Sequence, residues 1–246
     1  MRFIAPSRYD HRDRHYRRKN SLLRESVDLR EWDSPIESQR SLGSCSGNAM
    51  TNAYELTVKR IYPDRFTELS RLFVYYNSRV IDNTTGEDVG AYLRSTLAAV
   101  KHQGICTEKL WPYNVDLFNV QPPPECYLEA AQRTITSYQS LNTLDDVLDA
   151  LNQNKPVIIG LTVYDSFNQV DRYDPVIRMP GRSELGQGGG HAMTAVGYDL
   201  NRRQILVKNS FGTDWGTMGY GWLPFDYVSA ESFENWIFDI SEQPIL

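Results

Sequence analysis

One cysteine stands among small polar residues where a helix is expected to begin. Cys45 lies in the segment SLGSCSGN, residues 41–48, and apolar residues then recur at three- and four-residue spacings as far as Ile61. This spacing predicts a helix with Ser44 at its N-cap. The positive end of a helix dipole favours a thiolate, and small neighbours let a substrate backbone approach. Cys45 is therefore a candidate nucleophile rather than a core residue.

A nucleophilic thiol needs a base, and His191 is the candidate among the four histidines. It opens an apolar run that is followed by a turn near residue 200 and by a second apolar run. A hairpin centred on that turn would set His191 opposite Asn209. The Asn209 amide oxygen would accept a hydrogen bond from one ring nitrogen and leave the other nitrogen for the thiol. The dipole and the imidazole together are expected to lower the pKa of Cys45 below about 7.5.

Three segments together resemble the papain-like (C1) cysteine peptidases. The first is Gln39 with Cys45 six residues later, the second is the sequence GGHA around His191, and the third is KNSFGTDWG, residues 208–216. The match runs from about residue 27 to residue 238. The segment before Cys45 lacks the cysteine that eukaryotic members carry three residues before the nucleophile. In this respect the chain is similar to bacterial and viral members.

The resemblance implies a role for each residue at the motif positions. It makes Cys45 the nucleophile and His191 the general base and acid. It makes Asn209 the residue that orients the histidine, and Gln39 a donor to the oxyanion. Such a site hydrolyses peptide bonds through a thioester acyl-enzyme and needs no metal or cofactor. The alternative is a catalytically silent papain-fold module that binds peptides or proteins.

The same resemblance predicts the residues that bind the substrate. Gly90 stands where relatives hydrogen-bond the substrate backbone. A deep apolar pocket for the residue before the scissile one is expected to be lined by Tyr92, Leu93, Gly160 and Ala192. Trp215 is expected to shelter the histidine–asparagine hydrogen bond from water. The full predicted set is Gly43, Ser44, Gly90, Tyr92, Gly160, Gly190, Ala192 and Trp215.

Hydrophobic patterning predicts an α+β protein with two halves. Residues 27–130 show helical spacing, including segments 66–78 and 91–104, and residues 131–246 show short apolar runs typical of strands. The resemblance implies a helical left domain and an antiparallel, barrel-like right domain with a cleft between them. An amphipathic helix is expected at residues 143–151, with a solvated acidic face. Residues 111–126 read as an ordered loop, flanked by two cysteines that are expected to be buried thiols.

Residues 1–26 form a basic arm that differs from the rest of the chain. They carry a net charge of +5, which leaves −10 for the rest of a chain whose formal charge is −5. In relatives of the resembled family an N-terminal extension lies across the cleft. The arm is therefore either a short pro-segment that covers the cleft, which would make the chain a zymogen, or a solvated tail. Nucleic acid is an unlikely partner because Asp10 and Asp13 interrupt the basic residues.

Composition limits the remaining possibilities. With 246 residues and 41% hydrophobic content, the chain is long enough for one large or two small globular domains. It contains no apolar run of membrane-spanning length and no signal-like start, so we expect a monomer that is cytoplasmic as made and has no membrane partner. The three cysteines suit a reducing compartment. The expected partner is a polypeptide substrate.

Overall fold

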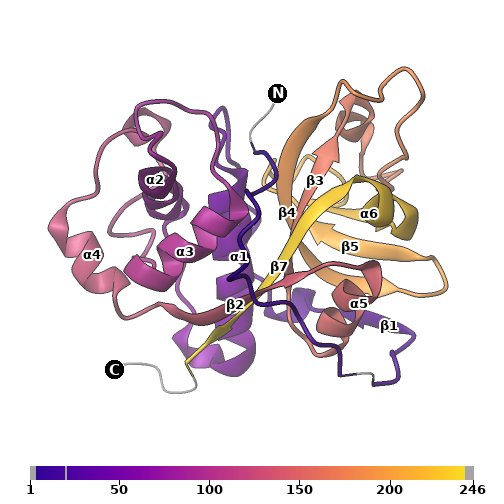
Figure 1. Ribbon diagram of the computed structural model, residues 1–246, viewed down its shortest axis with the longest axis horizontal. Helices are drawn as coiled ribbons and strands as arrows, with labels where there is room; N and C mark the ends of the chain where they lie inside the picture. Colours follow the sequence, from indigo (N-terminus) through magenta and orange to yellow (C-terminus); the bar gives the residue numbers. More distant parts are fainter. Residues whose placement is uncertain (1–3, 20, 242–246) are drawn as a thin grey trace.

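The computed structural model describes residues 4–19 and 21–241, so residues 1–3 and 20 of the basic arm and residues 242–246 lie outside the described part. In the described part, helices α1 to α4 form one half of the molecule. An antiparallel sheet with helices α5 and α6 forms the other half (Figure 1). The predicted α+β class, with helices in the first half and strands in the second, is confirmed. No helix among these residues combines the length and apolar composition needed to cross a bilayer.

Helix α1, Cys45–Ile61, is the predicted nucleophile helix and lies between the two halves (Figure 1). It packs on strand β4 and on helix α2. Its apolar positions from Ala49 to Leu56 are buried as the spacing predicts, whereas Ile61 at its end is 40% exposed. The Thr194 hydroxyl donates to the Ala49 carbonyl at 3.0 Å. Ser44 occupies the N-cap position, but its side chain accepts no capping hydrogen bond.

The other helices of this half are α2 (Arg71–Asp82), α3 (Leu93–Gln103) and α4 (Pro124–Ala130). Helix α2 starts later than predicted because the Ser70 hydroxyl accepts the Phe73 N–H at 3.1 Å and so caps the first turn. Helix α3 ends at Gly104, whose φ of 79° terminates it as expected. Residues 111–126, which were predicted to form an ordered loop, include the first residues of α4. The two cysteines that flank it are buried and free.

Seven strands of the described residues form a single antiparallel sheet. They are β1 (Ser26–Asp28), β2 (Ile135–Leu141), β3 (Val157–Val163), β4 (Gly189–Asp199), β5 (Gln204–Lys208), β6 (Tyr220–Pro224) and β7 (Ser232–Ile240). Their order is β2-β7-β3-β4-β5-β6, and β1 also pairs with β4. Strand β7 was not predicted, although it lies between β2 and β3 and buries Trp236, Ile237 and Phe238.

Two helices lie beside the sheet, α5 (Leu144–Asn152) and α6 (Phe225–Glu231) (Figure 1). Helix α5 matches the predicted segment and begins with a capping box, in which Thr143 and Asp146 each bond to the backbone of the other. Helix α6 was not predicted. The main core lies between these helices and the sheet, and a second apolar cluster lies between α1 and the sheet.

The predicted hairpin register is wrong. Strand β4 pairs with β5 through Thr194 opposite Lys208, so Asn209 lies beyond the paired region and not opposite His191. A bulge between Ala195 and Gly197 shifts the register, because β4 contributes one more residue than β5 at this point. Asn209 therefore reaches His191 through its side chain and is not the residue directly opposite it on the neighbouring strand.

The basic arm runs along the boundary between the two halves (Figure 1). Every third side chain turns toward the body, as in an extended, polyproline-like chain, and the side chains between them are exposed. The side chains that turn inward are Ile4, Ser7, Asp10, Asp13 and Tyr16. This periodicity separates the arm into an inner face and an outer face.

The inner face of the arm makes specific contacts with β4 and α3. Ile4 forms an antiparallel bridge with Gly190. Arg94 of α3 binds two arm carboxylates, with Nη2 at 2.7 Å from Asp13 and at 3.2 Å from Asp10. These ion pairs are largely shielded from solvent, since the three side chains are between 14% and 19% exposed.

The arm then continues along α5. The Tyr16 hydroxyl donates to Asp149 at 2.7 Å, and Arg18 pairs with Asp145 at 2.8 Å. Asp149 is only 3% exposed. The prediction of a solvated acidic face on this helix is therefore wrong for Asp149, which contacts the arm, whereas the Asp145 side chain remains 67% exposed.

Candidate active site

Cys45 lies at the first position of α1 and its side chain is fully buried. The backbone N–H groups of Ser46, Ala192 and Cys45 itself hydrogen-bond to the sulfur. Ala192 directly follows His191 in β4. The packing of α1 on β4 therefore brings the thiol to the strand that carries the candidate base.

The predicted hydrogen bond between His191 and Asn209 is present, with 2.8 Å between Nε2 and Oδ1. Asn209 Oδ1 also accepts the Ser210 N–H at 2.8 Å, which fixes the amide with its oxygen toward the ring. His191 Nε2 is consequently the N–H donor, and Nδ1 is the unprotonated acceptor. Nδ1 is buried and has no hydrogen-bond partner among the residues that the structure describes. It is the free nitrogen that a thiol proton would need.

Gln39 is held by both ends of its amide. Oε1 accepts the Ser210 hydroxyl at 2.6 Å, and Nε2 donates to the Leu42 carbonyl at 2.8 Å. The orientation is therefore fixed, and the nitrogen faces the loop that precedes Cys45. Because an amide nitrogen carries two hydrogens, the second remains available as a donor. Gln39 is 1% exposed, so water does not compete for that position.

The pKa of Cys45 is not lowered in this structure. Burial raises the pKa of Cys45 to about 12, against the lowering effect of the three backbone hydrogen bonds. Burial also lowers the pKa of His191 to about 4, although the hydrogen bond with Asn209 acts in the opposite direction. Burial therefore favours the neutral form of both groups. The expected pKa below 7.5 is wrong for this state because the residues are closed off from water.

Aromatic rings cover His191, but Trp215 is not in direct ring contact with it. Phe211 and Phe167 lie with ring centroids 4.9 Å and 5.6 Å from the imidazole. Trp215 packs behind Phe167 at 5.1 Å. Phe167 belongs to a 3₁₀ helix, Asp165–Gln169, that no local pattern in the sequence connects with the histidine.

Several of the predicted substrate-binding residues lie near Ile4, the first described residue of the arm. Ile4 packs in one apolar cluster with Cys45, Ala192 and Leu93, and it bridges Gly190. A cavity of about 690 Å³ adjoins this cluster. The residues that line it are Ile4, Ala5, Ser7, Arg8, Ile81, Asp82, Thr84, Val89, Gly90, Ala91, Tyr92, Arg94 and Ser95. Gly90 and Tyr92 of the predicted set are thus beside the arm.

The expected deep pocket at Gly160 is filled. A methyl group at this glycine would meet Phe233 at 2.8 Å and Leu93 at 2.9 Å. The two side chains occupy the space that the glycine leaves. Trp215, by contrast, belongs to the core cluster of the sheet half and not to the cluster that holds Cys45.

The loop before Cys45 is held by residues that sequence reasoning missed. Asp88 accepts the Gly43 N–H at 2.9 Å and the Tyr75 hydroxyl at 2.5 Å. Tyr113 lies 2.5 Å from the Ser44 hydroxyl and donates to the Gln39 carbonyl at 2.8 Å. No pattern linked these residues with Cys45, since Tyr75 comes from α2 and Asp88 and Tyr113 come from distant loops. Their effect is to fix the backbone that would surround an oxyanion.

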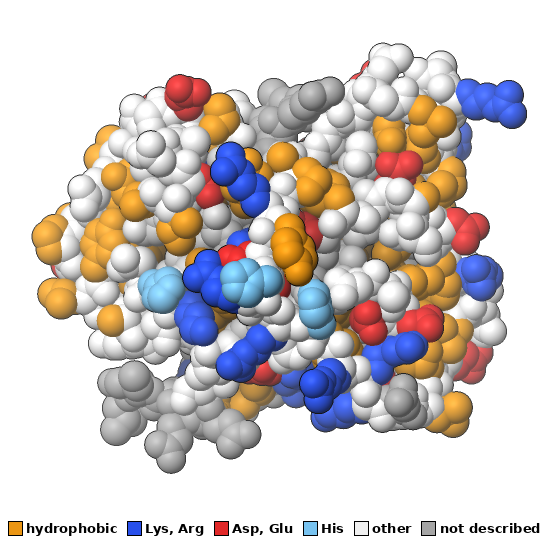
Figure 2. Space-filling model, in the orientation of Figure 1, with side chains coloured by type: hydrophobic (Ala, Val, Ile, Leu, Met, Phe, Trp, Pro, Cys, Tyr) orange, Lys and Arg blue, Asp and Glu red, His pale blue; other side chains and the backbone are white. Residues whose placement is uncertain are grey.

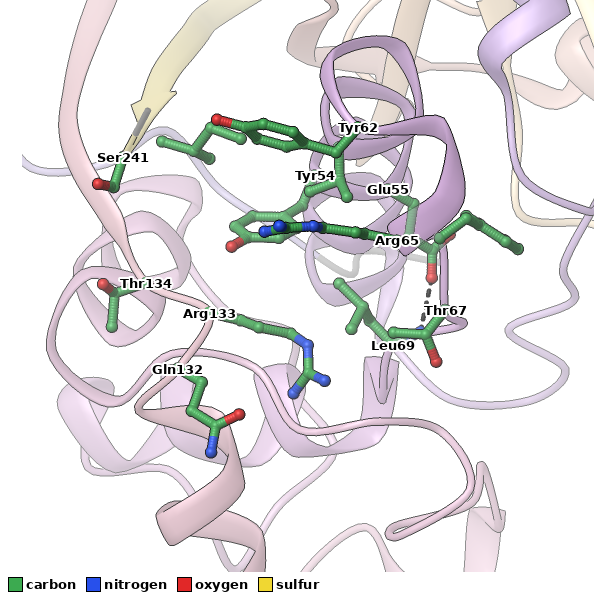
Figure 3. Close-up of a pocket in the computed structure, with 13 residues that line it drawn as sticks. Tyr54, Glu55, Tyr62, Arg65, Thr67, Leu69, Gln132, Arg133, Thr134 and Ser241 are labelled. Carbon is green, nitrogen blue, oxygen red and sulfur yellow. Dashed lines mark hydrogen bonds between the residues drawn. The ribbon is translucent and has the colours of Figure 1, made fainter. Parts of the chain in front are cut away.

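A further cavity of about 420 Å³ lies at the opposite end of α1 from Cys45 (Figure 3). Tyr54, Tyr62 and Arg65 line it from one side and Arg133 from the other. Glu55 is buried, and its carboxylate accepts the Leu69 N–H at 2.7 Å. Burial raises the pKa of Glu55 to about 7. This cavity is separate from the candidate active site. In the described residues, no group of three metal-binding side chains is found.

Comparison with known proteins gives the family. The model of the papain family of cysteine proteases matches residues 23–229. An uncharacterized peptidase C1-like protein of Acanthamoeba polyphaga mimivirus is 35% identical over 236 residues, which cover 91% of this chain and 75% of that protein. Cysteine proteinase 3 of Dictyostelium discoideum is 28% identical over 202 residues, or 79% of this chain and 57% of that protein.

A solved structure agrees with this assignment. The crystal structure of xylellain, a cysteine protease from Xylella fastidiosa, superimposes with a TM-score of 0.89 at 28% identity, and the match covers 97% of this chain and 95% of that chain. The chain therefore belongs to the papain family of cysteine proteases. The predicted papain-like fold and the likeness to bacterial and viral members are confirmed.

Proposed function

We propose that the protein is a cysteine endopeptidase that cleaves peptide bonds with Cys45, His191, Asn209 and Gln39. The observation that carries this proposal is the free Nδ1 of His191, on a ring that Asn209 orients, next to a strand whose backbone contacts the Cys45 sulfur. A merely structural histidine in a core would have both nitrogens satisfied. The neutral, oriented ring is what a general base requires.

In the proposed reaction, His191 Nδ1 takes the thiol proton and the Cys45 sulfur attacks the substrate carbonyl carbon. The carbonyl oxygen becomes an oxyanion, which accepts hydrogen bonds from the Cys45 N–H and from Gln39 Nε2. His191 then gives its proton to the leaving amine, and a thioester remains on Cys45. Water, deprotonated by His191, attacks the thioester, and the sulfur leaves with restoration of the starting state.

We further propose that the arm holds the enzyme inactive as a short pro-segment. Ile4, bridged to Gly190, occupies the apolar surface beside Cys45. Its position also accounts for the neutral state of the site, since opening of the arm would return water to His191 and to the thiol. Arg94 binds the arm through Asp10 and Asp13, and α5 binds it through Asp149.

The variant Arg94→Gln tests the inhibitory role of the arm. It removes two shielded ion pairs, so the arm opens more often and the rate of hydrolysis of a labelled protein substrate is expected to rise about tenfold, which corresponds to 1.4 kcal/mol. Arg178→Gln removes an exposed ion pair elsewhere and serves as the matched control. An unchanged rate in folded Arg94→Gln would exclude inhibition by the arm.

Trapping of the acyl-enzyme tests the chemistry. A peptide ester is mixed with the Arg94→Gln protein, and the reaction is quenched in acid before mass spectrometry. We expect the acyl group on the peptide that contains Cys45, and its absence in His191→Ala. Cys106→Ser, which changes another buried thiol, should still acylate. Acylation elsewhere, or none with an open arm, would refute the peptidase.

A further inference from the structure

The outer face of the arm is a basic surface that the proposed inhibitory role does not use. Arg8, Arg12, Arg14 and Arg17 are all exposed on it. Helix α3 extends this surface with the exposed residues Lys101 and His102. Figure 2 shows the Lys, Arg and His side chains gathered on this side of the molecule. The rest of the chain is acidic, so the positive charge is concentrated here.

The two acidic residues of the arm neutralise only Arg12 on this face. Asp10 and Asp13 turn inward, and each lies within 3.2 Å of an Arg94 nitrogen. Asp10 also binds Arg12. Arg8, Arg14 and Arg17, by contrast, have no ion pair with another described residue. The sequence argument against an anionic polymer assumed that the acids interrupt the basic surface, and the period of three in the arm removes that assumption.

One exposed aromatic side chain belongs to the outer face of the arm. Tyr9 is 89% exposed and is flanked in the chain by Arg8 and, three residues on, by Arg12. An exposed ring between cations suits a base that stacks on it while its phosphates contact the arginines. A duplex keeps its base faces covered, and a sulfated polysaccharide has no bases to stack.

A hollow beside the arm provides a second contact region. It has a volume of about 420 Å³ and lies between the arm and α3. Its lining includes Arg14, Lys101, His102 and Tyr138, and also Asp10 and Asp13, whose carboxylates are paired with Arg94. Lys101 already lies 5.7 Å from the Tyr138 ring centroid. Cations and an aromatic ring therefore border the same hollow.

We propose that the outer face of the arm, together with the part of this hollow that Lys101 lines, binds single-stranded nucleic acid. Arg8, Arg14, Arg17 and Lys101 contact the phosphates, and Tyr9 stacks with a base. The recognition is independent of sequence, because phosphates and base faces are common to every strand. It does not depend on peptidase activity, since none of these residues belongs to the proposed catalytic set.

Fluorescence anisotropy with a fluorescein-labelled 20-nucleotide oligo(dT) tests this proposal on the intact full chain. Binding is measured between about 20 and 200 mM NaCl. Four phosphate contacts predict a slope of log K against log salt of about −3, since each contact on a single strand contributes about −0.7. The triple variant Arg8→Gln, Arg14→Gln, Arg17→Gln should reduce the slope to about −1. Intact mass is checked before and after each titration.

Matched variants separate a specific surface from general charge. Arg178→Gln, Arg202→Gln and Arg203→Gln remove the same charge from other exposed positions and should leave binding unchanged. Tyr9→Ala should weaken binding about tenfold. Tyr173→Ala changes another ring, 81% exposed, and should have no effect.

Four results would overturn the proposal. They are the absence of binding at the lowest salt, an equal loss in both triple variants, an unchanged affinity in Tyr9→Ala, and competition by heparin or duplex DNA at least as strong as by unlabelled oligo(dT). The last two would mean that the surface attracts any polyanion. Circular dichroism of each variant ensures that a loss of binding is not a loss of fold.

Discussion

At the scale of single residues, the two ring nitrogens of His191 differ in their surroundings. Nε2 donates to Asn209, whose own orientation is fixed by the Ser210 N–H. Nδ1 is buried without a partner in the described part of the chain, which is costly unless another group uses it. A tautomer held in this way can accept a proton without first rotating the ring. The arrangement therefore favours proton transfer at Nδ1 over a purely structural role.

Gln39→Ala tests the proposed oxyanion donor. Loss of one donor should lower kcat by about 100- to 1000-fold with little change in KM, because the interaction forms only in the transition state. Steady-state kinetics in an Arg94→Gln background measure this. Ser210→Ala is the control, since it removes the same side-chain hydrogen bond but keeps the donor, and its loss should be smaller. Equal losses would show that Gln39 acts only by holding the loop.

The residues with the rarest chemistry could be predicted from the sequence. The chain has only three cysteines and four histidines, so few residues are candidates for a nucleophile and a base. The residues that flank Cys45 and His191 then distinguish them from the others. Phe167 and Tyr113 could not be predicted, because an aromatic residue in a loop gives no sign of the distant residue that it will contact. The pKa values were also mispredicted, since the sequence does not reveal how deeply Cys45 and His191 are buried.

At the scale of elements, Gly190 lets the arm pair with β4. A methyl group at this position would meet the Ile4 carbonyl oxygen at 2.0 Å. Gly190→Ala should therefore displace the arm and increase the iodoacetamide reaction rate of Cys45 about tenfold or more. Gly181→Ala, where the nearest atom lies at 3.6 Å, is the control and should have no effect. A rate equal to that of the wild type would show that Ile4 does not restrict access.

Burial of His191 predicts a pH-dependent arm. Its pKa falls to about 4 in the covered state, against an ordinary value of 6.5. The covered state is therefore fully stable above pH 6.5, and it loses about 1.4 kcal/mol per pH unit as the pH falls from 6.5 toward 4. Burial raises the pKa of Asp13, which acts in the opposite sense. We expect the net effect to follow His191, the more deeply buried group.

Hydrogen exchange of residues 4–16, corrected for the intrinsic effect of pH, measures this opening. Exchange at pH 5 should exceed exchange at pH 7 on the order of tenfold, as an opening that costs less free energy is more populated. His191→Asn, which cannot be protonated, should show no such increase. The same increase in that variant would assign the pH dependence to other groups.

The elements with strong local signals could be predicted, and those set by tertiary pairing could not. Segments α1, α3 and α5 show clear spacing and termini, including the glycine after α3 and the capping box of α5. Strand β7 has the sequence SFENWIFDI, with no regular alternation, because both of its edges and much of its length are enclosed. The bulge in β4 likewise depends on its neighbours.

At the scale of the whole molecule, a buried ion pair links the two halves. Lys208 of β5 binds Asp33 at 2.9 Å, with side chains 0% and 2% exposed. Asp33 also accepts the Tyr220 hydroxyl at 2.8 Å. The adjacent Ser34 donates to Asn52 of α1 at 3.1 Å. The segment after β1 therefore connects the sheet with the nucleophile helix.

Lys208→Met tests this link. The substitution leaves the Asp33 carboxylate buried without its partner, which should cost about 3–5 kcal/mol and lower Tm by about 10 °C. Thermal unfolding followed by circular dichroism measures it. A second substitution, Asp33→Asn, should restore part of the loss because the uncompensated charge is removed. A decrease in Tm of under about 2 °C in the single variant would contradict a structural role.

The course of the arm could not be predicted as a whole. Its charge predicts docking to an acidic body, and the arm does contact the acidic face of α5. However, a period of three is neither helical nor strand-like, so the pattern did not reveal which residues face inward. Asp10 and Asp13 face inward because they pair with Arg94 of α3, and this tertiary contact has no local signal in the sequence.

The central claim is that Cys45 and His191 form a reactive pair covered by the arm. The most direct measurement is the rate of Cys45 alkylation by iodoacetamide against pH, located by mass spectrometry, in the wild type, in Arg94→Gln and in Arg94→Gln with His191→Ala. We predict slow reaction in the wild type, and fast reaction in Arg94→Gln with an apparent pKa below about 7 that is lost without the histidine. Titration of Cys45 as an ordinary thiol near about 8.5 in all three proteins would contradict the account.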